Sequence, residues 1–553
     1  MPRDDHIDKP YLPNRKDFHL EKGTVMKSLM KKVFAAAAAI ATVFGLAATT
    51  VATANAADNA TLTVSTTDAK FAGKTVNAYK MFSATVSGDG KAVSYTLTDE
   101  WKPFFKNSVG LTGVTDENVN DKANDYVSKL KDSTLVAFAT KASNWAQTKA
   151  NNITADATAT VSADASNGKY TATFTGLGYG YYVVAVPGAT LANAKSQYAT
   201  LVSVHSTKVD ADIKGDLPTV DKKVQVDGTG KDATDAKIGD TLTFTLTSTI
   251  PDMSAYDTYT FNFKDTLSKG LTFGQVKSVK VENVTLTENT DYTVTTPTAS
   301  NNNTLTVAMK DFKTKQQANA GKKITVTYTA TLNENAVVGG AGNVNSAKIQ
   351  YSNNPSTNGT GESEPSKVRV FTYGFTVDKY TGDQYTDAAT RLAGAEFTLA
   401  HKDGSAISFV QVSAGSATAN AVYRVAKAGE TGTTTITTPA NGKVVFEGLK
   451  NGEYTLTETE APAGYNKLAS AIGVKVNGQN NGTDTTNATV TITYNNDNGN
   501  DYNQTASNGV IPVQNKSGAI LPGTGGMGTI AFTVIGVLVI ALGVAWTLKR
   551  KNA

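Results

Sequence analysis

Two lysines fall on strand faces whose other side chains are apolar. In the run VDKKVQV, alternation places Lys222 on the same face as the three valines, and in FTVDK it places Lys379 with Phe375 and Val377. A lysine on a core face is costly unless its amine is paired or neutral, although at a sheet edge it can reach out to water. Two such lysines, each in the first strand of a predicted domain, indicate a common chemical cause.

Acids and asparagines recur on matching faces further along each domain. Asp265 alternates with apolar residues in FNFKDTL, and Glu458 does so in YTLTE. Asn345 lies on the apolar face of NSAKIQY, with Asn343 at the same parity, and Asn515 lies on the apolar face of IPVQN. We therefore expect each domain to bury a lysine, an acid and an asparagine. Ordinary salt bridges and hydrogen bonds among them remain the alternative.

Strands must position these side chains. Between residues 57 and 520, runs such as TLTFTLT and KITVTYT have the period of two that is typical of half-buried strands, and Asn-Gly and Asp-Gly turns separate them. A helical stretch is expected near 121–149. Short strands at regular spacing predict a mainly β protein of tandem immunoglobulin-like β-sandwich domains.

The predicted organisation follows from composition shifts near 214–218 and 359–366 and from the two ends of the chain. Its parts are a mis-assigned extension over 1–25, a signal peptide over 26–56, an N-terminal domain over 57–215, a middle domain over 216–367, a C-terminal domain over 368–516, and a sorting tail over 521–553 with a membrane helix at about 528–548.

Both ends carry address signals. From Met26, a basic start, an alanine-rich apolar run and the small-residue exit Ala-Asn-Ala are typical of a secretory signal peptide. At the other end, an apolar run and the basic residues KRK follow a short motif, as in a membrane stop with a cytoplasmic tail. The motif is Leu521, Pro522, Gly523, Thr524 and Gly525. This tail resembles the LPxTG sorting signal, which implies that sortase cleaves between Thr524 and Gly525.

Composition excludes several kinds of chemistry. The chain has no cysteine, so disulfides and thiol catalysis are excluded, and its four histidines form no cluster. A net charge of +4 is too balanced to indicate nucleic acid as a partner. No Ser-His-Asp order, Gly-x-Ser-x-Gly motif or metal-ligand spacing is found, so we expect no enzyme, no metal and no cofactor.

Four segments resemble Gram-positive backbone pilins. YTLTETEAPAGY, which contains Glu458, resembles their E-box, and LAGAEF after Lys379 resembles the opening of a collagen-adhesin B-type domain. The segments around Lys222 and Asn345 resemble the isopeptide-forming middle domain of the same pilins. The resemblance implies collagen-adhesin A/B-type sandwiches and a major fimbrial subunit.

The resemblance also implies intramolecular Lys–Asn isopeptide bonds. We expect Lys222 to join Asn345 with Asp265 as proton shuttle, Asn343 being the reserve. We expect Lys379 to join Asn515 with Glu458 as proton shuttle. Burial favours the neutral, nucleophilic amine and the protonated acid, which fits this chemistry. Each bond is expected to join the first strand of its domain to the last.

Backbone pilins polymerise through a lysine that attacks the sortase thioester of the next subunit. The VYPK form of that motif is missing here, and the nearest counterpart is Lys214 in ADIK, with Lys208 as the rival. The resemblance implies a wall-attached covalent pilus shaft that supports adhesion. Its expected partners are pilin-specific and housekeeping sortases, identical subunits, basal and tip pilins, and peptidoglycan.

A wall-anchored monomeric adhesin that uses the same domains as a stalk is the alternative function. The Asp-x-Ser-x-Ser motif of tip adhesins is absent, since Asp164-Ala-Ser166 lacks the final serine. Host glycans or matrix stay open as ligands, because the sequence shows no site for them. The expected location is the cell surface, with transient membrane anchoring through the C-terminal helix.

Overall fold

The computed structural model describes residues 59–189, 199–355, 358–387, 389–479, 488–496 and 501–518, and a few helical residues between 537 and 546. The chain divides into two compact units. One contains residues 1–234, 241–331 and 343–369, and the other contains 235–240, 332–342 and 370–553. The mainly β fold predicted from the sequence is confirmed, whereas the domain boundaries stay a prediction.

The first part of unit 1 combines two sheets with helices. Strands in the order β5-β1-β8 form one sheet, and β3-β2-β6-β7 with β4 on β2 form the other. Their bounds are β1 Ala60–Thr66, β2 Thr75–Val86, β3 Val93–Leu97, β4 Ala157–Thr160, β5 Tyr170–Leu177, β6 Gly180–Ala185, β7 Ala199–Val204 and β8 Lys208–Asp212.

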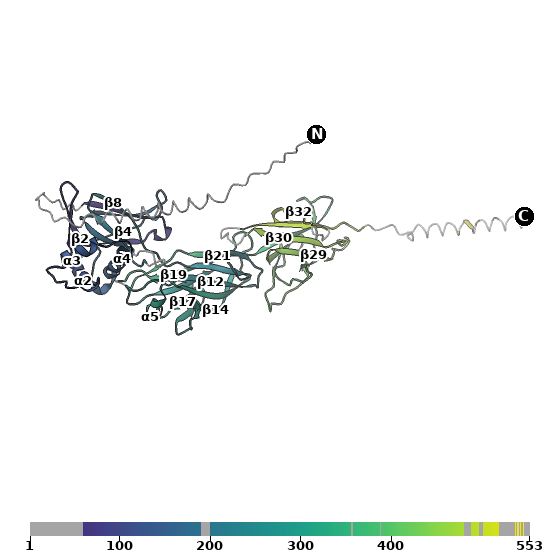
Figure 1. Cartoon of the computed structure of the whole chain (residues 1–553). Coiled ribbons are helices and arrows are strands. Elements are labelled where there is room, and N and C mark those ends of the chain that lie inside the picture. The colour runs from purple at the N-terminus through teal and green to yellow at the C-terminus, as the bar shows by residue number, and fades with distance from the viewer. Residues whose placement is uncertain are drawn as a thin grey trace, which may run out of the picture. The chain divides into compact units, whose positions relative to one another are not determined.

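Helices α2 (Lys102–Asn107), α3 (Val119–Ser128) and α4 (Asp132–Gln147) accompany these sheets (Figure 1). Helix α3 lies beside β3, and α4 lies beside β6 and β7. Helices α2 and α4 bury aromatic side chains in the same core as the sheet residues, among them Phe104 and Phe138. The single helical stretch expected near 121–149 is therefore two helices, α3 and α4, with α2 before them.

The second part of unit 1 is a sandwich of two sheets. Strands in the order β10-β9-β12-β18-β14-β15 form one sheet, and β11-β21-β19-β13-β17-β16 with β20 on β19 form the other. Helix α5 (Phe312–Gln316) is short. The strand bounds are β9 Asp221–Val226, β10 Thr229–Lys231, β11 Ala233–Asp235, β12 Thr241–Thr249, β13 Phe261–Leu267, β14 Leu271–Val281, β15 Val284–Thr285, β16 Tyr292–Thr295, β17 Thr304–Met309, β18 Lys323–Leu332, β19 Asn343–Ser352, β20 Thr360–Glu362 and β21 Ser366–Phe371.

Unit 2 is also built on two sheets. One has the order β23-β22-β28-β26-β25 with β33 on β22, and the other has the order β27-β24-β29-β30-β31-β32. The bounds are β22 Tyr373–Thr381, β23 Thr390–Arg391, β24 Glu396–His401, β25 Phe409–Ser413, β26 Ala421–Val425, β27 Ile436–Thr437, β28 Lys443–Leu449, β29 Gly452–Glu460, β30 Ile472–Gln479, β31 Thr489–Asn495, β32 Gln504–Thr505 and β33 Val510–Gln514.

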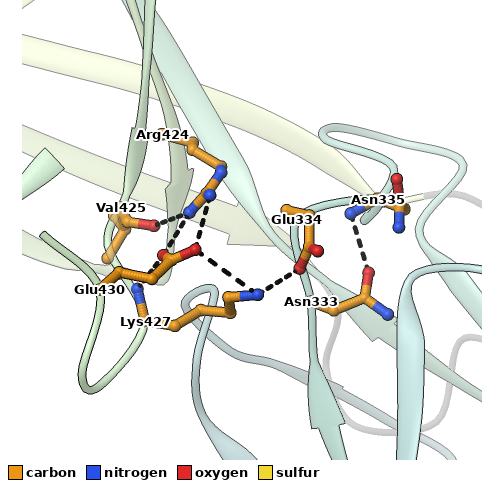
Figure 2. Close-up of polar contacts among 7 residues, drawn as sticks. All are labelled: Asn333, Glu334, Asn335, Arg424, Val425, Lys427 and Glu430. Atoms are coloured by element: carbon orange, nitrogen blue, oxygen red, sulfur yellow. Dashed lines mark hydrogen bonds and ion pairs between the residues drawn. The ribbon is translucent and has the colours of Figure 1, made fainter. Parts of the chain in front are cut away.

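An ion-pair network ties the segment 332–342 to the rest of unit 2 (Figure 2). The guanidinium of Arg424 binds both carboxylate oxygens of Glu430, at 2.7 and 2.8 Å. Lys427 Nζ lies 2.6 Å from Glu334 Oε2 on that segment and 3.6 Å from Glu430 Oε1. These side chains are partly open to solvent, so the network contributes little to stability.

Candidate functional site

Lys222 and Lys379 are the lysines that are buried among the described residues, each with 0% exposure. The acids and asparagines that the sequence pairs with them are buried too. These are Asp265, Asn345, Glu458 and Asn515. Strand alternation produces this result, because each residue occupies the inward parity of a strand, or of its direct continuation in the case of Asn515, and most other residues at that parity are apolar.

In the middle sandwich, the side chains come from both sheets. Strand β9 carries Lys222, which is opposite Leu246 of β12 in one sheet. In the other sheet, Asp265 of β13 is opposite Ala347 of β19, and Leu267 is opposite Asn345. The acid and the amide are therefore diagonal neighbours on the inner face of their sheet, and the amine reaches them from the facing sheet.

The Lys222 amine donates to the carboxylate of Asp265 and to the hydroxyl of Tyr328, the latter at 2.8 Å. The Tyr328 hydroxyl donates to Asp265 Oδ2 at 2.5 Å and accepts from Asn345 Nδ2 at 2.6 Å. Asn345 Oδ1 has no hydrogen-bond partner among the described residues. The predicted lysine, acid and amide are thus brought together around one tyrosine hydroxyl.

Burial controls the charge of this amine. Desolvation lowers the pKa of Lys222 to about 8, although the nearby Asp265 carboxylate works in the opposite direction. The amine also lies 5.1 Å from the ring centroids of Phe244 and Tyr328. The neutral, nucleophilic form is therefore far more accessible to Lys222 than to a solvated lysine.

In unit 2, the lysine and the asparagine lie on neighbouring strands of one sheet. Strand β22 pairs in parallel with β33, with Lys379 opposite Val513, and Asn515 follows β33 on the same face. The Asn515 N–H donates to the carbonyl of Tyr380 at 3.0 Å, which continues the pairing beyond the strand. Glu458 reaches the pair from β29 of the other sheet.

The backbone of Lys379 is held on both sides. Its N–H donates to the carbonyl of Gly442 at 2.8 Å, and its carbonyl accepts from the N–H of Leu392 at 3.0 Å. Gly442 has φ +71°, and a Cβ there would lie 2.5 Å from the Lys379 carbonyl oxygen, so only glycine fits. The Asn-Gly turn read from the sequence therefore fixes the strand that carries the lysine.

Here the acid contacts both partners directly. Lys379 Nζ lies 2.9 Å from Glu458 Oε1, and Asn515 Nδ2 donates to Glu458 Oε2 at 3.0 Å. Asn515 Nδ2 also donates to the carbonyl of Asn466 at 2.9 Å, and the N–H of Leu468 donates to Glu458 Oε2 at 2.7 Å. Burial lowers the pKa of Lys379, with the Glu458 contact opposing the shift.

The expectation that each bond joins first and last strands fits one domain only. Asn515 directly follows β33, whereas β19, which carries Asn345, is followed by β20 and β21. For the middle domain the expectation is wrong. The reason is that the segment 359–366, where a domain boundary was expected, contains β20 and the start of β21.

The two lysines considered for polymerisation lie near the end of the first part of unit 1. Lys208 is exposed and opens β8, opposite Thr61 of β1. Lys214 follows β8, is partly exposed, and lies 3.4 Å from Asp212 Oδ2. Both amines are accessible to solvent, so geometry does not exclude either one.

The predicted signal peptide over 26–56 and the motif from Leu521 to Gly525 lie outside the described residues, as does most of the membrane helix predicted at about 528–548. In the part of the chain that the structure describes, no helix has the length and apolar character needed to cross a membrane.

The sequence reading missed Tyr328 and the groups beside Glu458. The signal for Tyr328 was present, because in KITVTYT it shares the inward parity of Ile324 and Val326. A buried tyrosine hydroxyl needs a hydrogen-bond partner, and the inward-facing polar groups of Lys222, Asp265 and Asn345 were candidates for that role. No comparable pattern indicated the backbone groups of Asn466 and Leu468.

The fold and these two buried sets define a tandem β-sandwich protein with candidate internal crosslinks. Residues 238–355 match the family described as Gram-positive pilin backbone subunit 2, Cna-B-like domain. Residues 383–491 match the family described as SpaA, prealbumin-like fold domain. These matches confirm the resemblance to Gram-positive backbone pilins that the sequence motifs indicated.

A comparison with individual proteins gives a relative of low sequence identity. The chain is 25% identical over 279 residues to the trypsin-resistant surface T6 protein of Streptococcus pyogenes serotype M6, and this match spans 46% of the chain and 44% of that protein. The chain therefore matches less than half the length of this relative.

The solved structures that match the chain include backbone pilins. The T6 backbone pilin of S. pyogenes has 18% identity and a TM-score of 0.44, covering 83% of this chain and 99% of that one. The major pilin SpaD of Corynebacterium diphtheriae has 19% identity and a TM-score of 0.39, covering 83% and 98%. Similarity at this level does not by itself assign a function.

Proposed function

We propose that the chain is the backbone subunit of a sortase-assembled covalent pilus on the Gram-positive cell wall, where it acts as a structural shaft that supports adhesion. The observation that carries the proposal is the presence of two buried Lys–acid–Asn sets, one in each of two sandwich domains. Buried amines beside buried amides are costly in a protein that only needs to fold. Their recurrence is explained if each set forms an isopeptide bond.

Each bond would form without any enzyme. The neutral amine of Lys222 or Lys379 attacks the side-chain carbonyl carbon of Asn345 or Asn515. Asp265 or Glu458, holding a proton that it exchanges with the amine, polarises the amide and gives a proton to the departing nitrogen. The products are a secondary amide and ammonia.

A shaft subunit benefits from these bonds because it carries load along its chain. In unit 2, β22 and β33 are parallel neighbours at the start and end of the sandwich. A bond between Lys379 and Asn515 would pass force directly from one to the other and bypass the strands between them. In a chain without cysteine, it would also restrict the unfolded state, as a disulfide does.

Assembly would use the sorting motif near the C-terminus of one subunit and a lysine near the end of the N-terminal domain of the next. Sortase would cleave after Thr524, and the amine of Lys214 on the next identical subunit would take over the acyl group, with Lys208 as the reserve. Pilin-specific sortase would build the polymer, and housekeeping sortase would join it to peptidoglycan beside basal and tip pilins. The C-terminal helix would hold the subunit in the membrane until cleavage.

Intact-mass measurement of the full-length chain tests the internal bonds. We expect a mass lower than the sequence mass by two ammonia molecules, and lower by one in Asn345→Ala and in Asn515→Ala. An unshifted mass would refute the crosslinks. An immunoblot of wall extracts tests the polymer, because a ladder of high-mass species is expected of a shaft and a single band is expected of a monomeric adhesin.

A further inference from the structure

The two buried sets differ in how the acid reaches the amide. In unit 2, the amide of Asn515 donates directly to the carboxylate of Glu458 at 3.0 Å. In the middle sandwich, the amide of Asn345 donates instead to the hydroxyl of Tyr328 at 2.6 Å, and that hydroxyl donates to Asp265 at 2.5 Å. Aspartate is one methylene shorter than glutamate, and the tyrosine hydroxyl occupies the place between acid and amide.

Tyr328 is held firmly in this position. Its residue is 0% exposed, on β18, and its ring stacks on Phe244 with centroids 5.3 Å apart. The ring of Phe273 lies at 6.1 Å. The hydroxyl also accepts from the Lys222 amine at 2.8 Å, so one oxygen atom contacts the nucleophile, the acid and the leaving group.

We propose that Tyr328 is a catalytic residue of the Lys222–Asn345 bond, relaying a proton between Asp265 and the departing nitrogen of Asn345. The proposal rests on the proposed function, since it requires that this bond forms. Unit 2 needs no such relay, because Glu458 contacts its amide directly.

The proton transfers in the relay leave no net change on the acid or the tyrosine. The neutral Lys222 amine attacks Cγ of Asn345, and the bond from Cγ to Nδ2 breaks. With the proton shared by this pair lying on Asp265, the acid gives it to the Tyr328 oxygen. The hydroxyl, which donates to Asp265 before the reaction, turns to Nδ2 and passes its own proton to that nitrogen. The amine then returns one proton to Asp265, and ammonia leaves. The acid and the hydroxyl both end as they began, and no further reactant is consumed.

The Tyr328 hydroxyl is suited to pass a proton on, and not to act as a general base. Burial, followed by the nearby Asp265 carboxylate, raises the pKa of Tyr328 well above its ordinary value. The phenolate form is therefore strongly disfavoured, and the hydroxyl must gain and lose its proton in one step. Asn345 Nδ2 faces the hydroxyl at 2.6 Å, so the proton is delivered to the nitrogen that leaves as ammonia.

The test compares the rates of the two crosslinks in one molecule. In the full-length Tyr328→Phe chain, peptides that join Lys222 to Asn345 and Lys379 to Asn515 are quantified by mass at successive times after synthesis. We expect the first crosslink to form at least about 100-fold more slowly, as for loss of general acid–base catalysis, and the second to keep its rate. The matched control is Tyr256→Phe, because the buried hydroxyl of Tyr256 has no hydrogen-bond partner among the described residues.

A double variant separates a relay from simple damage to the fold. In Asp265→Glu with Tyr328→Phe, the longer acid should reach the amide as Glu458 does, and the crosslink should recover. An unchanged rate in Tyr328→Phe, or no recovery in the double variant, would overturn the relay. Absence of both crosslinks from the unmodified chain would instead overturn the proposed function, and the relay with it.

Discussion

Lys379 Nζ lies 2.9 Å from Glu458 Oε1, and both side chains are fully buried. The Glu458 contact opposes the lowering of the Lys379 pKa by burial, so a change of this acid changes the nucleophilicity of the amine. Glu458 also accepts from Asn515, which makes it the group best placed to serve both ends of a Lys379–Asn515 bond.

Glu458→Gln should therefore abolish or greatly slow the crosslink in unit 2. Glutamine keeps the size of the side chain but cannot shuttle a proton, and loss of a general acid–base costs about 10² to 10⁴ in rate. Mass analysis of the crosslinked peptides measures the effect. The control is Glu334→Gln, which removes a carboxylate from the partly exposed network of Figure 2 in the same unit and should leave both crosslinks intact. Normal crosslinking in Glu458→Gln would contradict the shuttle role.

Each asparagine variant should lower the stability of the domain that contains the asparagine and leave the other domain unchanged. Asn345→Ala and Asn515→Ala each open a loop on the order of 100 residues, for which the chain-entropy model gives about 4.7 kcal/mol. Calorimetry should show one transition shifted to lower temperature in each variant, with the other transition unchanged. Identical calorimetric traces for the variants and the unmodified chain would show that no covalent tie had been lost.

The Asn345→Ala variant should also acquire a pH dependence that the crosslinked chain lacks. Its free Lys222 amine has a pKa of about 8 when folded, against 10.5 as the reference value. Between these values the unfolded state binds more protons, so the free energy of unfolding rises with pH, by at most about 3 kcal/mol. Below pH 8 the Lys222 amine is charged in the folded state as well, so the full destabilisation caused by burying its charge is present.

Urea unfolding of Asn345→Ala at pH 7 and pH 10 checks this rise. The control is the double variant Lys222→Met with Asn345→Ala, which has no amine at this position and should lack the rise. If the single and double variants responded to pH alike, the dependence would not come from Lys222.

Strand parity was enough to place six side chains of the two sets, because a sandwich core imposes one inward face on each strand. Parity alone does not account for Asp378, which lies on the opposite face of FTVDK from Lys379 and is nevertheless 0% exposed. Arg391 and Tyr385 bind that carboxylate, and both lie outside the strand that carries Asp378, so the alternation of that strand could not indicate them. For Tyr328, parity indicates a place in the core but not the proposed relay, because a core tyrosine and a reacting tyrosine have the same parity.

Arg391→Met should be strongly destabilising. Arg391 Nε lies 2.6 Å from Asp378 Oδ1, and the hydroxyl of Tyr385 donates to Asp378 Oδ2 at 2.8 Å. Without the guanidinium, a buried carboxylate loses its closest cation, which costs about 3–5 kcal/mol. Chemical unfolding of unit 2 within the full-length chain measures the loss. Arg424→Met provides the contrast, since its partner Glu430 is much more exposed and the expected loss is about 1 kcal/mol or less. Equal losses in the two variants would show that burial of Asp378 is not what makes its ion pair matter.

Polymerisation should depend on one amine near the end of β8. Lys214 is partly exposed and only loosely paired with Asp212, at 3.4 Å, so little energy is needed to free it for attack on an acyl-enzyme. We expect Lys214→Ala to convert the ladder of a wall-extract immunoblot into a single band, and Lys208→Ala to keep the ladder. The two lysines lie in the same short segment and both reach solvent, so an effect on folding or export should appear in both variants, whereas loss of the nucleophile should appear in one. A ladder that persisted in Lys214→Ala and vanished in Lys208→Ala would transfer the role to Lys208, and a ladder that persisted in both would place the nucleophile elsewhere in the chain.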